Sequence, residues 1–261
     1  MANETPEAFS MSDLQNQTQN DRAFAQEMPG YFERSLGTTM DKLRHFAKYV
    51  PRQALSLFLA KDELFRKVVG VHGHIVECGV FLGGGLMTWA QSSAIHEPYN
   101  HVRRVVGFDT FAGFPHLAEE DQASRARERL PYVTEGGLAT GAEGDLCECI
   151  RLHDLNRPIG HIERVELVVG DAVQTIPSYV AANQHVVVAL LYLDFDLYEP
   201  TKIALETFLP RMPKGAIIAF DELAQKAWPG ETRAVLDTVG IRSLRIERFP
   251  FVPQLSYAVL E

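Results

Sequence analysis

Two acidic pairs in the C-terminal half of the chain have residue types and positions that suit cation or proton chemistry. Asp194 and Asp196 follow one apolar run, and Asp221 and Glu222 follow the next. Runs of this kind are typical of buried parallel strands, whose carboxyl ends meet at one edge of a sheet. Carboxylate oxygens without cysteine or histidine favour Mg²⁺, Mn²⁺ or Ca²⁺ over zinc. An acid after a strand can instead be a helix N-cap or a solvated turn residue.

A glycine-rich turn in the upstream half suits a nucleoside ligand. Residues 73–85 form a short apolar stretch with the acidic Glu77, followed by a turn with Gly79 and Gly83 that opens a helix. Glycine allows a ligand to approach the backbone without a Cβ atom in the way. The spacing is not that of the G-x-G-x-x-G dinucleotide motif, which weakens an NAD interpretation. By itself the turn can also be only a tight strand-to-helix connection.

Two more expected strands end in acids. Asp109 follows residues 102–108, close to the interval after a glycine turn at which an acid accepts hydrogen bonds from ribose hydroxyls. Asp171 follows residues 165–170. Together with the glycine turn after the first strand, these four acidic strand ends predict a nucleoside site made by the first three strands, beside a cation site made by the fourth and fifth.

Four motifs of this chain resemble the macrocin O-methyltransferase family. They are ECGVFLG at 77–83, FDTFAGFP at 108–115, LDFDLYEPT at 193–201 and the acidic pair at 221–222. Members of that family depend on a cation, use S-adenosylmethionine and methylate sugar hydroxyls of macrolides, aminocoumarins and related glycosides. The resemblance runs from about Ile75 through Glu222, and the acidic motifs are far more specific than the glycine turn.

The resemblance implies a role for each matching position. The metal ligands match Asp194, Asp221 and Glu222, and the proposed general base matches Asp196. Glu222 departs from the Asp-Asp pair usual in the family, which leaves monodentate binding or another metal preference open. The resemblance also implies that Phe195, in place of a small residue, narrows the acceptor pocket. The candidates for binding S-adenosylmethionine are Glu77, Gly79, Gly83, Asp109, Thr110 and Asp171.

The expected fold is α/β, with seven strands near 74–79, 103–109, 165–170, 186–194, 215–221, 243–249 and 255–260. Alternation of strands and helices predicts a mostly parallel sheet with helices on both faces, and the close spacing of the last two strands predicts an antiparallel last strand. This pattern resembles the Rossmann-like sheet of class I methyltransferases. We expect a mobile segment over 1–30, a helical cap over 31–70 and the methyltransferase domain over 71–261.

Two helices separated by Pro51 are expected between Met40 and Val69, with apolar positions such as Leu43, Phe46 and Leu64 in the core. Four basic residues of this region are expected on a solvated face, with a contact to substrate or a second subunit as the alternative. These residues are Arg44, Lys48, Arg52 and Lys61.

A long insertion at about 113–161 exceeds an ordinary strand-to-helix connection. Its glycine-rich part, residues 134–144, is predicted to be a lid over the cofactor or acceptor, with an exposed excursion as the alternative. Trp228 can stack on a sugar or serve a buried structural role, and Tyr198 can form a pocket wall or helix packing. The scattered histidines show no ligand spacing.

Composition limits the partners of the chain. Its 261 residues, 46% of them hydrophobic, suffice for one large core, and its formal charge of −9 argues against nucleic acid as substrate. Three cysteines without disulfide or metal spacing, and an N-terminus without a signal sequence or apolar span, predict a cytoplasmic protein that does not enter a membrane. We expect a homo-oligomer.

The preferred interpretation is a Mg²⁺- or Mn²⁺-dependent O-methyltransferase that uses S-adenosylmethionine and a glycoside or sugar-nucleotide acceptor. A bound cation lowers the pKa of a sugar hydroxyl, and a carboxylate can then take its proton. An NAD-dependent sugar oxidoreductase or epimerase is the enzymatic alternative. A non-catalytic protein that binds S-adenosylmethionine is the third possibility.

Overall fold

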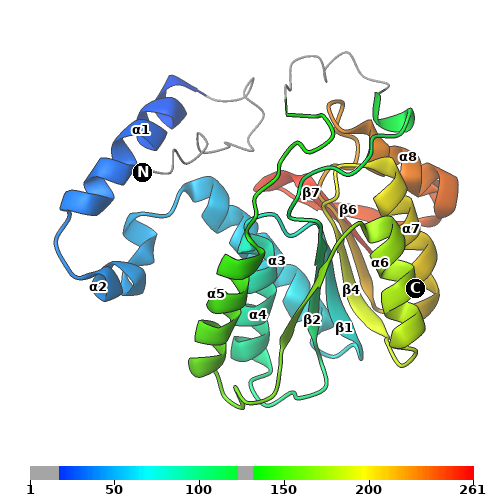
Figure 1. Cartoon of the computed structure of the whole chain (residues 1–261), viewed down its shortest axis with the longest axis horizontal. Helices are drawn as coiled ribbons and strands as arrows, with labels where there is room; N and C mark the ends of the chain where they lie inside the picture. The colour runs from blue at the N-terminus through cyan, green and yellow to red at the C-terminus, as the bar shows by residue number, and fades with distance from the viewer. Residues whose placement is uncertain (1–17, 123–131) are drawn as a thin grey trace. The chain divides into compact units, whose positions relative to one another are not determined.

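The computed structural model describes residues 18–122 and 132–261 (Figure 1). The chain divides into two compact units, Met1–Leu55 and Ser56–Glu261. The expectations for residues 1–17 and 123–131 lie outside the described residues. Within the described part, no helix is both long enough and apolar enough to span a bilayer.

The first unit contains two helices with capping boxes at their starts, α1 (Gln19–Arg34) and α2 (Thr39–Arg44). They are followed by the 3₁₀ helix η1 (Phe46–Lys48). Asp21 and Asp41 exchange backbone and side-chain hydrogen bonds with Thr18 and Thr38, which satisfies free N–H groups at each helix start. Helix α1 therefore occupies much of the segment that we expected to be mobile up to residue 30.

Helix α3 (Arg52–Val68) begins after Pro51, as predicted, and extends into the second unit. Its buried residues include Leu64 and Phe65, which pack in the core. The same prediction was wrong for Leu43 and Phe46, which are more than half exposed. Both residues lie on helices, as their spacing predicted, but their apolar side chains are exposed instead of buried.

The second unit is built on a seven-stranded sheet, as predicted. Its order is β3-β2-β1-β4-β5-β7-β6; β1 to β5 pair in parallel, and β7 is antiparallel to both of its neighbours. The strands are β1 (His74–Cys78), β2 (Val105–Asp109), β3 (Val165–Val169), β4 (Val188–Leu193), β5 (Ile217–Phe220), β6 (Ile246–Phe249) and β7 (Val252–Val259).

Helices cover both faces of this sheet and enclose two cores (Figure 1). One core contains side chains of α3, α4 (Gly84–His96) and α5 (Glu143–Leu155), and the other contains side chains of α6 (Ala172–Ala182), α7 (Tyr198–Phe208) and α8 (Pro229–Thr238). Strand β4 is buried along its whole length; Tyr192 belongs to the first core, and Leu191 and Leu193 belong to the second. Among the residues that the structure describes, the unit also contains the short 3₁₀ helices η2 (Glu120–Gln122), η4 (Leu209–Arg211) and η5 (Ile241–Ser243).

The glycine-rich part of the insertion pairs with the loop after β2. Phe114 and Gly136–Gly137 exchange two backbone hydrogen bonds, of 2.8 and 3.0 Å, and the N–H groups of Thr140 and Gly141 donate to the carbonyl of Phe111. Helix α5 begins at Glu143, inside the segment predicted as a lid. In this conformation residues 134–141 are therefore attached to the loop that follows β2.

Candidate active site

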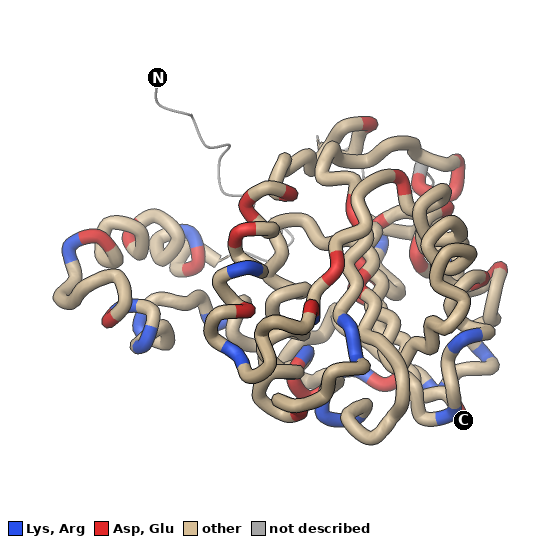
Figure 2. Tube along the Cα trace, turned by 60° about the horizontal axis from the view of Figure 1, so that its bottom comes forward, with Lys and Arg blue, Asp and Glu red and all other residues tan. Residues whose placement is uncertain are grey.

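Three carboxylates meet at the carboxyl ends of β4 and β5. Leu193 pairs with Phe220 at the ends of these neighbouring strands, so Asp194 and Asp221 come next along each chain segment. Asp194, Asp221 and Glu222 each offer an oxygen, and these atoms all lie within 4.8 Å of one another. The structure thus brings together the three residues predicted as metal ligands. Figure 2 shows acidic positions predominating in the upper part of the larger unit and basic positions mainly in the lower part.

Burial and mutual repulsion make the charged form of these acids unfavourable. Burial raises the pKa of Asp194 and of Glu222 well above the usual range, and the neighbouring Asp221 is the second cause for both. Burial likewise raises the pKa of Asp196 to about 8, again with Asp221 as the next cause. Without a cation, the cluster must therefore hold protons that ordinary carboxylates release at neutral pH.

The donor set fits a hard divalent cation. Its atoms are carboxylate oxygens, the ligands that Mg²⁺ and Mn²⁺ prefer. One of them, Oε2 of Glu222, is buried and has no hydrogen-bond partner within the described residues. A buried carboxylate oxygen without a partner carries a free-energy cost that a bound cation would remove.

Asp196 stands next to this set in a restrained backbone conformation. Its φ is +63°, in the left-handed region that Asp and Asn enter more readily than most side chains. An interaction with the side chain of Glu222 acts against burial and lowers the pKa of Asp196. The predicted general base therefore lies in contact with a predicted ligand.

Two residues that sequence reasoning missed support this cluster. The hydroxyl of Tyr192 donates to Oδ1 of Asp221 at 2.6 Å, and the N–H of Glu222 donates to Oε1 of Glu231 at 3.1 Å. Both side chains are buried. The available signal for Tyr192 was a hydroxyl within an otherwise aliphatic strand, and for Glu231 an acid close after the second acidic pair.

The glycines of the first turn are required by packing between protein segments. Gly79 has φ +95°, and a Cβ atom there would lie 1.9 Å from the carbonyl oxygen of Asp194. Gly83 has φ +84°, and its Cβ would lie 2.0 Å from Leu146. The backbone after β1 thus approaches the backbone after β4 closely, which places the glycine turn beside the acidic cluster. Binding of a cofactor by these glycines stays a prediction.

Glu77 lies in a buried ion pair. It is 1% exposed, and Lys61, which is 3% exposed, donates from Nζ to its Oε1 at 2.8 Å. The expectation of a solvated Lys61 was therefore wrong: its helix turns this position into the core, where the charge needs an opposite charge. Burial is the largest influence on Glu77 and raises its pKa, while Lys61 acts in the opposite direction.

Asp109 holds the glycine turn in place. Its Oδ2 accepts hydrogen bonds from the N–H groups of Val80 and Phe81 at 2.7 and 2.8 Å, and its Oδ1 accepts one from Phe111 at 2.7 Å. A carboxylate has about four acceptor positions, so this arrangement leaves room for one further donor. A ribose contact by Asp109 stays a prediction.

The two other cofactor candidates also have local partners. The Thr110 hydroxyl donates to the carbonyl of Gly113 at 2.7 Å, and Asp171 caps helix α6 by accepting from the N–H of Val173 at 3.0 Å. Asp171 therefore has the N-cap role that was the alternative for acids after strands. Their positions, after β2 and after β3, are those expected for a nucleoside site.

Two aromatic candidates are fixed by packing. Tyr198 is 8% exposed, and its hydroxyl donates to Asp237 at 3.1 Å, which favours helix packing over a pocket wall. Trp228 is partly buried, with its ring 6.1 Å from Phe114 and 6.3 Å from Tyr132. Trp228 thus joins the segment after β5 to the insertion beside the acidic cluster.

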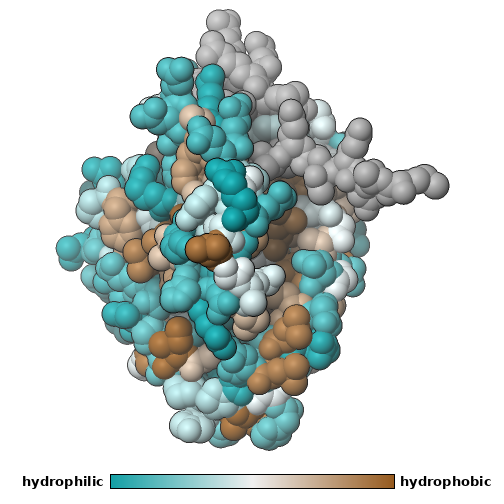
Figure 3. Space-filling model, turned by 90° about the vertical axis from the view of Figure 1, so that its left-hand side faces the viewer, coloured by the Kyte–Doolittle hydropathy of each residue, from teal (hydrophilic) through white to brown (hydrophobic). Residues whose placement is uncertain are grey.

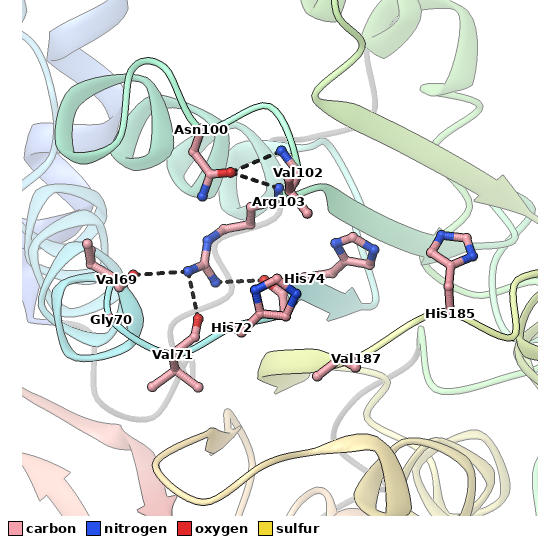
Figure 4. A pocket seen from close by; sticks show the side chains of 11 residues that line it. Val69, Gly70, Val71, His72, His74, Asn100, Val102, Arg103, His185 and Val187 are labelled. Atoms are coloured by element: carbon pink, nitrogen blue, oxygen red, sulfur yellow. Dashed lines mark hydrogen bonds between the residues drawn. The ribbon is translucent and has the colours of Figure 1, made fainter.

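A cavity of about 400 Å³ lies at the opposite, amino-terminal ends of β1 and β4 (Figure 4). The Arg103 guanidinium donates there to the carbonyls of Gly73 and Val71, both at 2.8 Å, and pairs with Glu97 at 2.8 Å. His74 accepts from the N–H of Arg104, and burial lowers its pKa to about 4. Because these groups serve the protein itself, the carboxyl end of the sheet is the better candidate for chemistry.

A family model of the Macrocin-O-methyltransferase (TylF) family matches residues 12–239, a range that contains all the acids of the cluster. The chain belongs to this family. The family resemblance expected from the motifs is therefore confirmed, together with the fold.

Solved structures and a curated relative agree with this membership. The crystal structure of CalS11, calicheamicin methyltransferase, is 34% identical, with a TM-score of 0.88 over 97% of this chain and 99% of that one. An apo structure of CalS11, described as a TDP-rhamnose 3'-O-methyltransferase, is 33% identical, with a TM-score of 0.80 over 95% and 98% of the two chains. The class I methyltransferase fold is confirmed by this likeness and by the strand order.

The 8-demethyl-8-(2,3-dimethoxy-alpha-L-rhamnosyl)-tetracenomycin-C 4'-O-methyltransferase of Streptomyces olivaceus is 30% identical over 155 residues. That match covers 59% of this chain and 54% of the relative, so the chain spans about half the length of the curated protein that it matches.

Proposed function

We propose that this protein is an O-methyltransferase that transfers the methyl group of S-adenosylmethionine to a sugar hydroxyl with the help of a divalent cation. The observation that carries the proposal is the convergence of Asp194, Asp221 and Glu222 at the carboxyl end of the sheet, in a chain of the TylF family. These three residues would bind Mg²⁺ or Mn²⁺. S-adenosylmethionine would lie over the ends of β1 to β3, against the turn that contains Gly79 and Gly83.

The residues of the chain divide the chemistry between them. When bound, a divalent cation lowers the pKa of a hydroxyl at the site and fixes its orientation. Asp196 accepts the hydroxyl proton while the oxygen forms its bond to the methyl carbon, and the electron pair of the breaking carbon–sulfur bond stays on sulfur. The turn held by Asp109 and the acidic cluster position the two reactants, which supplies much of the acceleration.

A deoxysugar, free as a nucleotide sugar or attached to a natural product, is the proposed acceptor. CalS11 is described as acting on TDP-rhamnose, and the tetracenomycin relative is named for a rhamnosyl hydroxyl. Phe195, between the two aspartates of the first pair, packs partly in the second core and would narrow the acceptor side of the site. Nucleic acid and membranes are not part of this proposal.

The test is methylation of TDP-rhamnose by the purified protein with S-adenosylmethionine, followed by mass spectrometry. We expect one added methyl group with Mg²⁺ and none with excess chelator. Glu222→Gln should abolish turnover, whereas the matched control Glu247→Gln on β6 should retain it, since Glu247 lies outside the acidic cluster and contacts Tyr257 and Arg245. Full activity in chelator would contradict the proposed need for a divalent cation.

Calorimetry separates this proposal from its two alternatives. We expect heat of binding with S-adenosylmethionine and none with NAD or NADP, because the chain lacks the dinucleotide motif. Binding of NAD alone would favour the sugar oxidoreductase or epimerase. Binding of S-adenosylmethionine without turnover on any glycoside would favour the non-catalytic protein.

We also propose that the protein is a cytoplasmic homo-oligomer. Exposed apolar side chains of the first unit support association, because a surface of this kind is unfavourable in water. They include Phe24, Phe32, Leu36, Met40, Leu43 and Phe46. On the face drawn in Figure 3, apolar side chains are exposed at several separate places among hydrophilic ones. The thiols of Cys78, Cys147 and Cys149 are free, as in a reducing compartment.

A further inference from the structure

A buried row of side chains joins the glycine-turn side of the site to the acidic cluster. The Lys61 ammonium, paired with Glu77, lies 3.9 Å from the centroid of the Tyr192 ring. The Tyr192 hydroxyl donates to Oδ1 of Asp221 at 2.6 Å. All members of the row except Asp221 lie in the interior. The row therefore runs without interruption from β1 through α3 and β4 to the end of β5.

This row is a poor device for stability alone. Removing a lysine and a glutamate from water costs about as much free energy as their attraction returns. Apolar side chains of similar size would stabilise the core equally well. The Trp89 ring, 5.6 Å from that of Tyr192 and 5.3 Å from Nζ of Lys61, fixes the positions of both. Such a rigid setting is what an orienting group needs.

The contact with Asp221 limits what that carboxylate can do. A hydroxyl that donates to Oδ1 fixes the carboxylate plane and leaves Oδ2 for another partner. The ammonium over the ring attracts its electron density, and the phenol becomes a stronger donor. Partners of this kind orient metal ligands and tune their basicity.

We propose that Tyr192 and Lys61 are positioning residues: Tyr192 orients Asp221 for the cation, and Lys61 fixes Tyr192 while it pairs with Glu77. The inference rests on the proposed function, since it assigns these residues to the cation site. Neither residue touches the reacting atoms. Their effect is on cation affinity, which is measurable without turnover.

The decisive variant is Tyr192→Phe, which keeps the ring and removes the hydroxyl. We expect its affinity for Mn²⁺, followed by the electron paramagnetic resonance signal of the free ion, to fall about 10–100-fold. Affinity for S-adenosylmethionine in the absence of metal should stay unchanged. A role in packing alone would leave Mn²⁺ affinity at the wild-type value, and that result would overturn the inference.

Tyr179→Phe is the matched control. The Tyr179 hydroxyl also donates to a carboxylate from a buried ring, to Glu166 at 3.1 Å, but Glu166 lies on β3 and outside the acidic cluster. This variant should bind Mn²⁺ as the wild type does. An equal loss in both variants would mean a general effect of removing a buried hydroxyl and would overturn the inference.

The part of Lys61 is tested with Lys61→Met/Glu77→Gln, which removes both charges and leaves no single buried ion. We expect this folded variant, checked by circular dichroism, to bind Mn²⁺ at least several-fold more weakly than wild type. Wild-type affinity for Mn²⁺ in this variant would overturn the role of Lys61 and leave Tyr192 as the only positioning residue of the two. Failure of the wild-type protein itself to bind Mn²⁺ would instead contradict the proposed function.

Discussion

Asp196 combines two properties that are rare in a single aspartate. Its backbone is left-handed, with φ +63°, and burial together with Asp221 raises its pKa to about 8. That value belongs to the metal-free cluster; a cation bound to the neighbouring carboxylates would lower the pKa of Asp196 and leave it ionised, the form that acts as a base. The unfavourable backbone conformation persists because the strand end before it and helix α7 after it hold the turn in place.

Asp196→Asn tests the base separately from the cation. Asparagine tolerates the left-handed conformation and keeps the shape of the side chain, but its amide does not accept the proton. We expect turnover to fall by about 10²–10⁴. Affinity for Mn²⁺ and for S-adenosylmethionine, measured by calorimetry, should change little. Near-normal turnover would assign proton transfer to another group.

The same aspartate predicts how the metal-free protein responds to pH. An unfolded aspartate titrates near about 3.9, whereas the folded pKa of Asp196 is raised to about 8. Between these values the folded form holds a proton that the unfolded form has released, so stability is greatest at the acid end and is lost as the pH rises through about 8. In chelator, the temperature at the midpoint of thermal unfolding should decrease as the pH is raised from about 5 to about 9. Mg²⁺ should flatten this slope, and an unchanged slope in Asp196→Asn would contradict the assignment to this residue.

Among the elements, the turn between β1 and α4 depends on an acid from the neighbouring strand. Asp109 on β2 accepts hydrogen bonds from three backbone N–H groups, two in that turn and one in the loop after β2. The sequence predicted the position of Asp109 at a strand end because an apolar strand ends there. The contact with Val80 and Phe81 was not predictable, because it depends on how closely β1 and β2 approach in the folded sheet.

Asp109→Ala should therefore have two effects. Three N–H groups lose their acceptor, and we expect a loss of about 1–3 kcal/mol in the free energy of unfolding. Affinity for S-adenosylmethionine should fall as well, because the variant loses both the support of the turn and the ribose contact that we propose for Asp109. Hydrogen exchange at Val80 and Phe81 should accelerate in the variant. Unchanged exchange there, or unchanged cofactor affinity, would contradict the respective role.

The segment of residues 134–144 is the element proposed as a lid. Only a few backbone hydrogen bonds attach residues 134–141 to Phe111 and Phe114, which is typical of a part that opens at low cost. Hydrogen exchange in 134–144 should slow when S-adenosylmethionine and an acceptor analogue are added together. Strand β6, at the edge of the sheet and outside both proposed sites, provides an internal reference whose exchange should not change. Equal exchange in 134–144 with and without ligands would leave the segment an exposed excursion.

For the whole molecule, the sequence predicted those features that repeat along the chain. Every strand begins or ends within a few residues of its expected position, because an apolar run bounded by turn residues has few alternatives in a buried sheet. The row from Lys61 to Asp221 was missed, since its members are far apart in sequence and only the packing of α3 on β4 brings them together. Lys61 is an example: adjacent positions on a helix face different sides, so a residue expected in solvent can instead lie in the core.

At the scale of the whole molecule, the exposed leucines of the first unit lead to a prediction about assembly. Leu36 and Leu43 are 91% and 58% exposed, and we expect them to be covered by a second copy of the chain. Light scattering should give the wild type at least twice the mass of one chain, and Leu36→Asp/Leu43→Asp should shift it toward the monomer. The control Leu152→Asp/Leu155→Asp changes the charge equally at exposed positions of α5 and should keep the wild-type mass. A monomeric wild type would refute the oligomer, and an unshifted double variant of the first unit would place the interface elsewhere.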